Sequence, residues 1–315
     1  MHNLVSVKNL SINELLNTDF HVSIFASGYE SRASYLARKI NKRKCGNILV
    51  FGFKEKNQLE SRKINDQFFK TLTDGIININ SQEEKEIYAT LIHVFEAYND
   101  VKEVNVLVDY TSMSRIWYSG ILNFFRLQNV HSTINVYLNY SLGAYKEDLN
   151  LLDYSYSSIN SIPSHEGSLS SNNKTTLVLG VGFSPYLIKS VIEEIEPNYI
   201  IGILPVPNIK ERYQEKSEKI KNDILTRDID KWINCSVSDL EAIFRTYAEI
   251  TNDCIHTQDI LFLSLGPKIF TIASLLVAQR FPQVTCLYLR TNNSRGDDVT
   301  ASGDCICSKI VYKNE

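Results

Sequence analysis

VSIFASG (residues 22–28) and LVLGVG (residues 177–182) are the two stretches of sequence that decide the fold. Each is a short apolar run that ends in glycine, and each precedes an amphipathic helical segment and a second apolar run, at 48–53 or 199–204. A strand, a tight turn and a helix in this order are typical of a βα unit in a parallel sheet. The two terminal glycines lie 154 residues apart, and later signals repeat at nearly the same offset. The sequence therefore predicts an internal duplication.

Two further strands are expected in each copy. Apolar runs at 104–108 and 260–265 lead into polar turns, and runs at 134–140 and 285–290 close the copies. Strands that are apolar throughout are buried on both faces, and long helical segments separate them here. This pattern predicts the α/β class, with two tandem doubly wound, Rossmann-like parallel-sheet domains.

The domain boundaries are expected in a polar stretch near the middle of the chain. We place the first Rossmann-like domain at residues 1–157, a linker rich in serine and asparagine at 158–173, and the second domain at 174–315. The length of 315 residues suits two domains of ordinary size. Arg62 lies nine residues after Phe53 and Arg212 nine residues after Ile203, each after the second strand of its copy, which also favours duplication.

Composition and charge argue against several classes of protein. A net charge of −3 is not that of a general nucleic-acid binder. Apolar runs stay well short of the ~20 residues of a membrane span, and the N-terminus lacks the pattern of a signal peptide. We therefore expect a cytoplasmic protein without membrane association.

The six cysteines predict neither disulfides nor a metal site. Cys305 and Cys307 form one C-x-C pair, for which alternation along a terminal strand is the favoured interpretation. GVGFSP (residues 180–185) ends in proline, so it does not match the G-x-G-x-x-G dinucleotide fingerprint. No cofactor is expected.

Polar residues follow the first strand of the first copy. Ser27 and Gly28 end that strand, and Ser27 is expected to hold a phosphate if a nucleotide binds here. Glu30 and Arg32 start the next helical segment. One interpretation is that Glu30 only caps the helix, where an acidic side chain is favourable. The other is that Glu30 contacts a ribose hydroxyl or acts as a general base, with Arg32 as an anion contact. Both stay open.

The third strand of the first copy leads into the most polar turn of the chain, DYTSMSR (residues 109–115). Thr111, Ser112 and Ser114 can donate to a phosphate, and Arg115 can pair with it. Asp109 can bind a sugar or act as a base. We favour a ligand-binding role, because polar groups that converge at the end of a parallel strand are typical of a site.

The second copy carries shorter versions of both turns. Gly182 permits a tight turn and a close approach, and Ser184 is expected to be an N-cap with Pro185 at the first helical position. Gly266 and Lys268 follow the third strand, and Lys268 takes a place similar to that of the arginine in the first copy. An ordinary capped turn and a phosphate contact are both compatible with this pattern.

At these turns the chain resembles the CRISPR-associated Rossmann-fold (CARF) sensor domains. GFSP (182–185) looks like their Gly-x-Ser-Pro turn, and DYTSMSR (109–115) is similar to their Asp-x-Thr turn that ends in Lys or Arg. GPK (266–268) looks like a shortened form of that second turn. The resemblance implies binding of cyclic oligoadenylates at the strand ends, a homodimer around a two-fold axis and a separate effector. Neither copy keeps both motifs, and the two copies could form the pair within one chain.

Three functions are compatible with these residues. The favoured one is a nucleotide-binding regulatory protein that senses a nucleotide or cyclic oligonucleotide, with an effector protein as partner, in bacterial defence or stress signalling. The second is an enzyme that hydrolyses such a ligand, with Glu30 or Asp109 as general base and Arg32 and Arg115 stabilising the anionic transition state. The third is a non-catalytic interaction subunit. The segment 291–298 either lines the same site or is a solvated loop.

Overall fold

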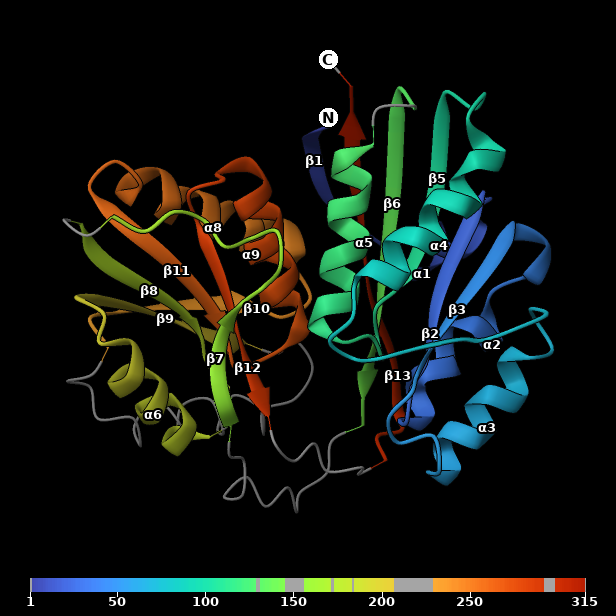
Figure 1. Cartoon of the computed structure of the whole chain (residues 1–315), viewed down its shortest axis with the longest axis horizontal. Coiled ribbons are helices and arrows are strands. Elements are labelled where there is room, and N and C mark those ends of the chain that lie inside the picture. The colour runs from blue at the N-terminus through green and yellow to red at the C-terminus, as the bar shows by residue number, and fades with distance from the viewer. Residues whose placement is uncertain are drawn as a thin grey trace. The chain divides into compact units, whose positions relative to one another are not determined.

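The chain forms two compact units, which are described separately (Figure 1). The computed structural model describes residues 2–128, 131–144, 156–170, 173–182, 184–206, 229–291 and 298–314. Unit 1 comprises Met1–Glu147 and Arg295–Glu315, and unit 2 comprises Asp148–Ser294. Each unit contains one largely parallel sheet with helices, which confirms the predicted α/β class with two Rossmann-like domains.

The sheet of unit 1 has the strand order β1-β13-β6-β5-β2-β3-β4. Its strands are β1 (Asn3–Leu10), β2 (Val22–Ser27), β3 (Asn47–Phe53), β4 (Ile77–Ile79), β5 (Glu103–Asp109), β6 (Thr133–Gly143) and β13 (Ala301–Lys313). Strands β2 to β6 are parallel, whereas β13 runs antiparallel to both of its neighbours, β6 and β1. The parallel strands form the order expected of a doubly wound sheet.

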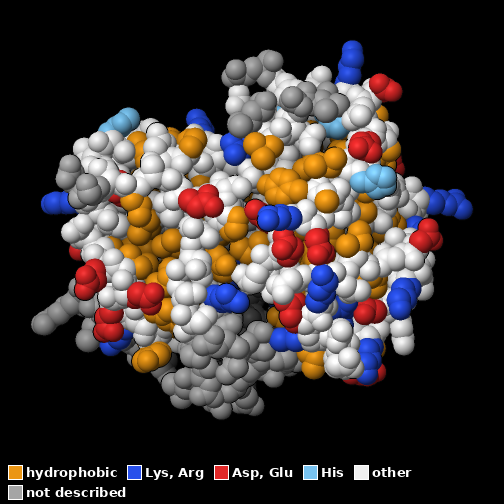
Figure 2. Space-filling model, in the orientation of Figure 1, with side chains coloured by type: hydrophobic (Ala, Val, Ile, Leu, Met, Phe, Trp, Pro, Cys, Tyr) orange, Lys and Arg blue, Asp and Glu red, His pale blue; other side chains and the backbone are white. Residues whose placement is uncertain are grey.

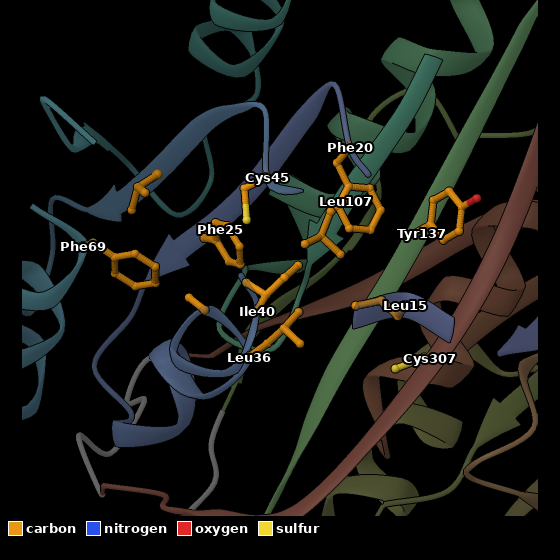
Figure 3. Close-up of a cluster of buried hydrophobic side chains, with 12 residues drawn as sticks. Leu15, Phe20, Phe25, Leu36, Ile40, Cys45, Phe69, Leu107, Tyr137 and Cys307 are labelled. Carbon is orange, nitrogen blue, oxygen red and sulfur yellow. The ribbon is translucent and has the colours of Figure 1, made fainter. Parts of the chain in front are cut away.

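Helices cover both faces of this sheet. They are α1 (Ile12–Asn17), η1 (Ser31–Ser34), α2 (Tyr35–Lys39), η2 (Lys42–Lys44), α3 (Glu60–Phe69), α4 (Lys85–Phe95), η3 (Glu96–Tyr98) and α5 (Arg115–Leu127). On one face, Leu36 of α2 and Phe69 of α3 pack with Phe25 of β2 in a buried cluster (Figure 3). On the other, Trp117 of α5 stacks on Phe53 of β3, with ring centroids 4.1 Å apart. The strands are therefore buried on both sides, as their apolar sequences predict.

Unit 2 repeats this topology. Its strands are β7 (Tyr156–Ser161), β8 (Lys174–Gly180), β9 (Tyr199–Val206), β10 (Lys231–Ser236), β11 (Gln258–Ser264) and β12 (Thr285–Thr291), and its described helices are α6 (Pro185–Ile195), α8 (Leu240–Cys254) and α9 (Lys268–Arg280). The order β10-β9-β8-β11-β12-β7 places the five parallel strands as β4-β3-β2-β5-β6 are placed in unit 1. In both units one antiparallel strand pairs with the last parallel strand. The shared order supports the predicted duplication.

The unit boundaries differ from the expected ones in two places. Residues 301–313, expected in the second domain, form β13 in the sheet of unit 1, where Ile310 and Tyr312 are fully buried. Residues 156–161, which overlap the start of the expected linker 158–173, form β7 and pair with β12. Alternating apolar residues identify a strand, but they do not identify the strand with which it pairs.

Candidate functional site

The sheet of unit 1 reverses its strand order between β2 and β5, which are parallel neighbours. Strands β3 and β4 lie on one side of this point, and β6 lies on the other. Ligands of open parallel sheets bind outside the carboxyl ends of the strands at such a reversal. Two segments begin there: the β2 loop (Gly28–Arg32) and the β5 loop (Asp109–Arg115).

The β2 loop and the β5 loop are in direct contact. A Cβ atom placed on Gly28 would lie 2.5 Å from Cβ and 2.6 Å from Oγ of Ser112, so this approach requires glycine. Ser141 of β6 joins the loops from the side. Its N–H donates to Thr111 Oγ1 at 2.8 Å, and its carbonyl accepts from Arg32 Nη1 at 3.1 Å. The two polar strand ends singled out in the sequence thus lie together.

Asp109 is buried beneath the β5 loop, with 2% of its surface exposed. Its Oδ1 accepts from the Thr111 N–H at 3.2 Å, from the Thr111 hydroxyl and from Asn139 Nδ2 at 3.0 Å. Thr111 and Asn139 are fully buried as well. A buried carboxylate held in this way fixes the conformation of a loop. The geometry therefore shows Asp109 and Thr111 positioning the loop, and the sugar, phosphate and general-base roles expected from the sequence stay predictions.

Glu30 and Arg32 form an ion pair within the β2 loop. Glu30 is the N-cap residue of η1, so it lies at a helix start as predicted, although its side chain makes no capping hydrogen bond. Its Oε2 accepts from Arg32 Nε at 2.7 Å, and Arg32 Nη1 donates to the Tyr140 hydroxyl at 3.2 Å. Burial lowers the pKa of Arg32, but Tyr140 and Glu30 outweigh this effect and raise it. Arg32 is therefore charged and already paired with a carboxylate.

The end of the β5 loop starts α5. Ser114 is the N-cap of this helix: its Oγ accepts from the Trp117 N–H at 3.2 Å and donates to the Ser81 carbonyl at 2.7 Å. Arg115, half-buried, is the first residue of the helix. Ser112 is 9% exposed, and its buried Oγ makes no hydrogen bond with any described residue. Buried hydroxyl groups nearly always have a partner, so this one marks a place for a ligand or water.

Helix α3 holds the β2 loop by a set of hydrogen bonds that the sequence did not suggest. Ser61 Oγ donates to the Tyr29 carbonyl at 2.5 Å. Asn65 Nδ2 donates to the carbonyls of Gly28 and Glu30, at 3.0 and 2.8 Å. Ser27 Oγ donates to Asp66 Oδ1 of the helix at 2.5 Å. Ser27, expected to contact phosphate, therefore donates to a protein carboxylate instead. The only sequence signal for these residues was their position in the helix after the second strand.

Arg62 of α3 is the centre of this network and is only 1% exposed. Its Nε donates to Asp66 Oδ1 at 2.7 Å, its Nη1 to the Phe53 carbonyl at 2.6 Å and its Nη2 to Asn78 Oδ1 at 2.8 Å. It therefore fastens α3 to the ends of β3 and β4. The sequence drew attention to this residue because Arg62 and Arg212 follow the second strands of the two copies at a similar distance. Arg212 itself lies outside the described residues.

The segment before β13 also reaches the β2 loop. The Ser31 N–H donates to one carboxylate oxygen of Asp298 at 2.6 Å, and its hydroxyl donates to the other at 2.5 Å. The Arg32 N–H donates to the Val299 carbonyl at 3.1 Å. The last residue of the segment 291–298 thus lies at the site, whereas residues 292–297 are outside the described part of the chain.

In unit 2 the two corresponding turns touch through their backbones. A Cβ atom on Gly182 would lie 2.2 Å from the Leu265 carbonyl oxygen, and one on Gly266 would lie 2.3 Å from the Val181 carbonyl oxygen. The close approach predicted at Gly182 and Gly266 therefore exists. The group that approaches is protein backbone, which fills the space that the glycines leave.

The helix that follows Gly182 begins as the sequence predicts. Ser184 is the N-cap of α6, its Oγ accepts from the Leu187 N–H at 3.3 Å, and Pro185 is the first helical residue. Lys268 is the first residue of α9, as Arg115 is of α5. The second copy thus keeps a cation at the matching position.

The C-x-C pair of the sequence lies on β13 of unit 1. Cys305 and Cys307 both lie on this strand, opposite Ser141 and Asn139 of β6. This confirms the predicted terminal strand, and burial raises the pKa of the Cys305 thiol to about 11. Within the described residues no group of three His, Cys, Asp or Glu side chains could hold a metal ion, and no helix is long and apolar enough to cross a bilayer.

Basic and acidic side chains are interspersed on the face of the molecule shown in Figure 2. A nucleic-acid-binding surface usually gathers Lys and Arg on one face or along one stripe. The described residues on this face do not form such a surface.

Comparison with known proteins gives little further information. No model of a protein family matches this chain, and no curated protein matches its sequence. Among solved structures, the cytoplasmic domain of a prokaryotic cation chloride cotransporter is 9% identical, with 86% of this chain and 95% of that chain covered and a TM-score of 0.24. A similarity at this level says nothing of function, which has to be inferred from the residues of the site.

Proposed function

We propose that unit 1 is a nucleotide-binding regulatory domain whose ligand, a nucleotide or cyclic oligonucleotide, places a phosphate at the start of α5. The observation that carries this proposal is the Ser112 hydroxyl, which is buried, lies against Gly28 and makes no hydrogen bond with a described residue. The start of a helix of 13 residues favours an anion through its free N–H groups and its dipole. A phosphate oxygen would accept from Ser112 and gain the charge of Arg115.

The corresponding position of unit 2 offers less to a ligand. The residue that matches Ser112 at the offset of 153, which relates Arg115 to Lys268, is Leu265, which has no hydroxyl and whose carbonyl oxygen lies against Gly182. Lys268 supplies a cation there, and the nearby Ser264 hydroxyl donates to the Pro267 carbonyl at 3.5 Å. These differences favour unit 1 as the binding unit.

A sensing role fits this site better than hydrolysis. Asp109 is buried and hydrogen-bonded, and Glu30 is paired with Arg32, so neither carboxylate is placed as an open general base. The resemblance of the motifs to CARF domains supports a cytoplasmic role in bacterial defence or stress signalling, with an effector protein as partner and a homodimer as the assembly. Hydrolysis and a purely structural subunit are the alternatives that the test separates.

Ser112→Ala separates ligand binding from folding. Removing a buried hydroxyl without a protein partner should leave the free energy of unfolding unchanged or raise it by up to about 1 kcal/mol. The same change should weaken binding about tenfold, since it removes one hydrogen bond to a charged group. Titration calorimetry and thermal shift with inorganic phosphate, AMP, ATP and cyclic tetra-adenylate measure both quantities.

Arg115→Ala, at the first position of α5, is a second test, and Lys268→Ala, at the first position of α9, is its matched control. Arg115→Ala should weaken binding by a similar factor, and Lys268→Ala should not change it. No binding by any of the four ligands, or an equal loss in Lys268→Ala, would contradict the proposal. If the protein hydrolyses a bound ligand and Glu30→Gln abolishes this hydrolysis, the protein is an enzyme instead.

A further inference from the structure

The chain returns from unit 2 to unit 1 across the β2 loop. Residues 298–300, here called the return segment, come after the end of unit 2 and lead directly into β13. The Asp298 carboxylate accepts from both the N–H and the hydroxyl of Ser31, and the Val299 carbonyl accepts from the Arg32 N–H. Two consecutive residues of the return segment thus hold two consecutive residues of the β2 loop.

Asp298 takes the place of a helix cap. Ser31 is the first residue of η1, and the N-cap residue Glu30 makes no side-chain hydrogen bond to this helix. The first N–H groups of a helix need an acceptor, and a carboxylate is a strong one. The carboxylate of Asp298 fills this need from 267 residues further along the chain. The conformation of the β2 loop therefore depends on the return segment as well as on the sequence of the loop.

The chain also leaves unit 1 at this place. Strand β6 ends at Gly143, and the N–H of the next residue, Ala144, donates to the Thr300 carbonyl at 2.8 Å. A Cβ atom on Gly143 would lie 2.6 Å from Val299 Cγ1 and 3.3 Å from Arg32 Nη1, so both residues pack closely against this glycine. The outgoing and returning parts of the chain are therefore joined to each other beside the β2 loop.

Hydrogen bonds run without a break from the return segment to the β5 loop. The N–H of Arg32 is bonded to the return segment, and its Nη1 donates to the Ser141 carbonyl at 3.1 Å. Ser141 in turn donates its N–H to Thr111 Oγ1 at 2.8 Å. At the other end of the β2 loop, Gly28 lies against Ser112. The return segment thus holds the loop that packs against the Ser112 hydroxyl.

We infer that the return segment regulates ligand binding in unit 1, with Asp298 as the positioning residue of the β2 loop. The inference rests on the proposed function and adds the element that controls it. Coupling of this kind is reciprocal, so a ligand that binds the β2 loop in this conformation also stabilises the contact with Asp298. Ligand binding therefore restrains the chain where it passes between the two units.

Asp298→Ala tests this inference, with Asp304→Ala as its matched control. Asp304 is exposed on β13 and carries the same charge. By charge alone, loss of a carboxylate strengthens the binding of an anion. A positioning role predicts the opposite: Asp298→Ala should weaken the binding of ATP and cyclic tetra-adenylate about fivefold, and Asp304→Ala should leave both within about twofold. Asp298→Asn keeps one acceptor oxygen and should give an intermediate affinity in titration calorimetry.

Two further measurements separate positioning from a general loss of stability. The urea midpoint of Asp298→Ala should match that of the unaltered protein, because the contact with Ser31 is exposed. Without ligand, the amides of residues 31–32 should exchange with deuterium faster in Asp298→Ala than in the unaltered protein. With ligand, exchange in residues 298–301 of the unaltered protein should slow.

The outcomes distinguish this inference from the proposed function. Binding by Asp298→Ala as strong as that by Asp304→Ala, together with weaker binding by Ser112→Ala, would overturn the inference and leave the proposed function standing. Unchanged exchange in residues 298–301 on ligand binding would also overturn the inference. Absence of binding by the unaltered protein would overturn both.

Discussion

Replacing Arg62 by methionine is expected to lower the free energy of unfolding of unit 1 by about 3–5 kcal/mol. The substitution removes three hydrogen bonds of a residue that is 1% exposed, and it leaves Asp66 with the Ser27 hydroxyl as its remaining partner in this network. Asp66, whose side chain is 25% exposed, would lose its cation, and the Phe53 carbonyl and Asn78 Oδ1 would lose their donor. Breaking a hydrogen-bond network around a buried charge is among the most destabilising single changes. Urea denaturation followed by circular dichroism measures the loss.

Arg245→Met is the matched control for this prediction. Arg245 pairs with Glu241 at 3.2 Å on an exposed surface of α8, in the same i, i+4 arrangement as Arg62 and Asp66. Exposed pairs contribute about 0–1 kcal/mol, so this variant should unfold nearly as the unaltered protein does. Adding Asp66→Asn to Arg62→Met should recover part of the stability, because it removes the uncompensated charge. Similar losses for Arg62→Met and Arg245→Met would show that the buried network does not stabilise unit 1.

Gly182→Ala is expected to destabilise unit 2 by about 3 kcal/mol or more, the upper range for overpacking. The added Cβ atom would lie 2.2 Å from the Leu265 carbonyl oxygen, and a backbone atom cannot be moved aside by a change of rotamer. Gly28→Ala in unit 1 should cost about 2 kcal/mol, because its Cβ meets the side chain of Ser112. The two glycines therefore occupy equivalent turns with different consequences.

A second substitution distinguishes these two cases. Ser112→Gly removes the atoms that Gly28→Ala would meet, so the double variant should recover most of the stability lost in unit 1. No truncation of the Leu265 side chain should rescue Gly182→Ala to a similar extent, since the closest atom is the carbonyl oxygen. Thermal and urea unfolding of the four variants provide the test. Absence of rescue by Ser112→Gly would mean that the β2 and β5 loops are not in the contact described.

Much of the fold could be predicted from local sequence patterns. Apolar runs located the parallel strands, and Ser184 with Pro185 located the start of α6, because capping depends on neighbouring residues alone. The partner of β13 could not be predicted, since strand pairing joins residues far apart in the chain. The same reason applies to β7, which was expected to be linker and pairs with β12.

The sequence predicted the location of the candidate site better than the roles of its side chains. Parallel strands bring their carboxyl ends to one edge, so the β2 and β5 loops were expected together. Burial then decides which side chains remain available, and sequence does not give burial at single-residue level. Asp109 and Ser27 became structural hydrogen-bond partners, whereas Asn65 and Asp298 hold the β2 loop without any motif that would have drawn attention to them.

Hydrogen–deuterium exchange with and without ATP or cyclic tetra-adenylate tests most directly the claim that unit 1 binds a phosphate at the start of α5. Ligand should slow exchange of the amides in residues 28–32 and 111–117, because Gly28 lies against Ser112 and the second segment contains Ser112 and the first turn of the helix. Exchange in residues 181–188 and 265–271 of unit 2 should not change. Protection confined to those segments of unit 2, or no protection in the β5 loop, would contradict the account.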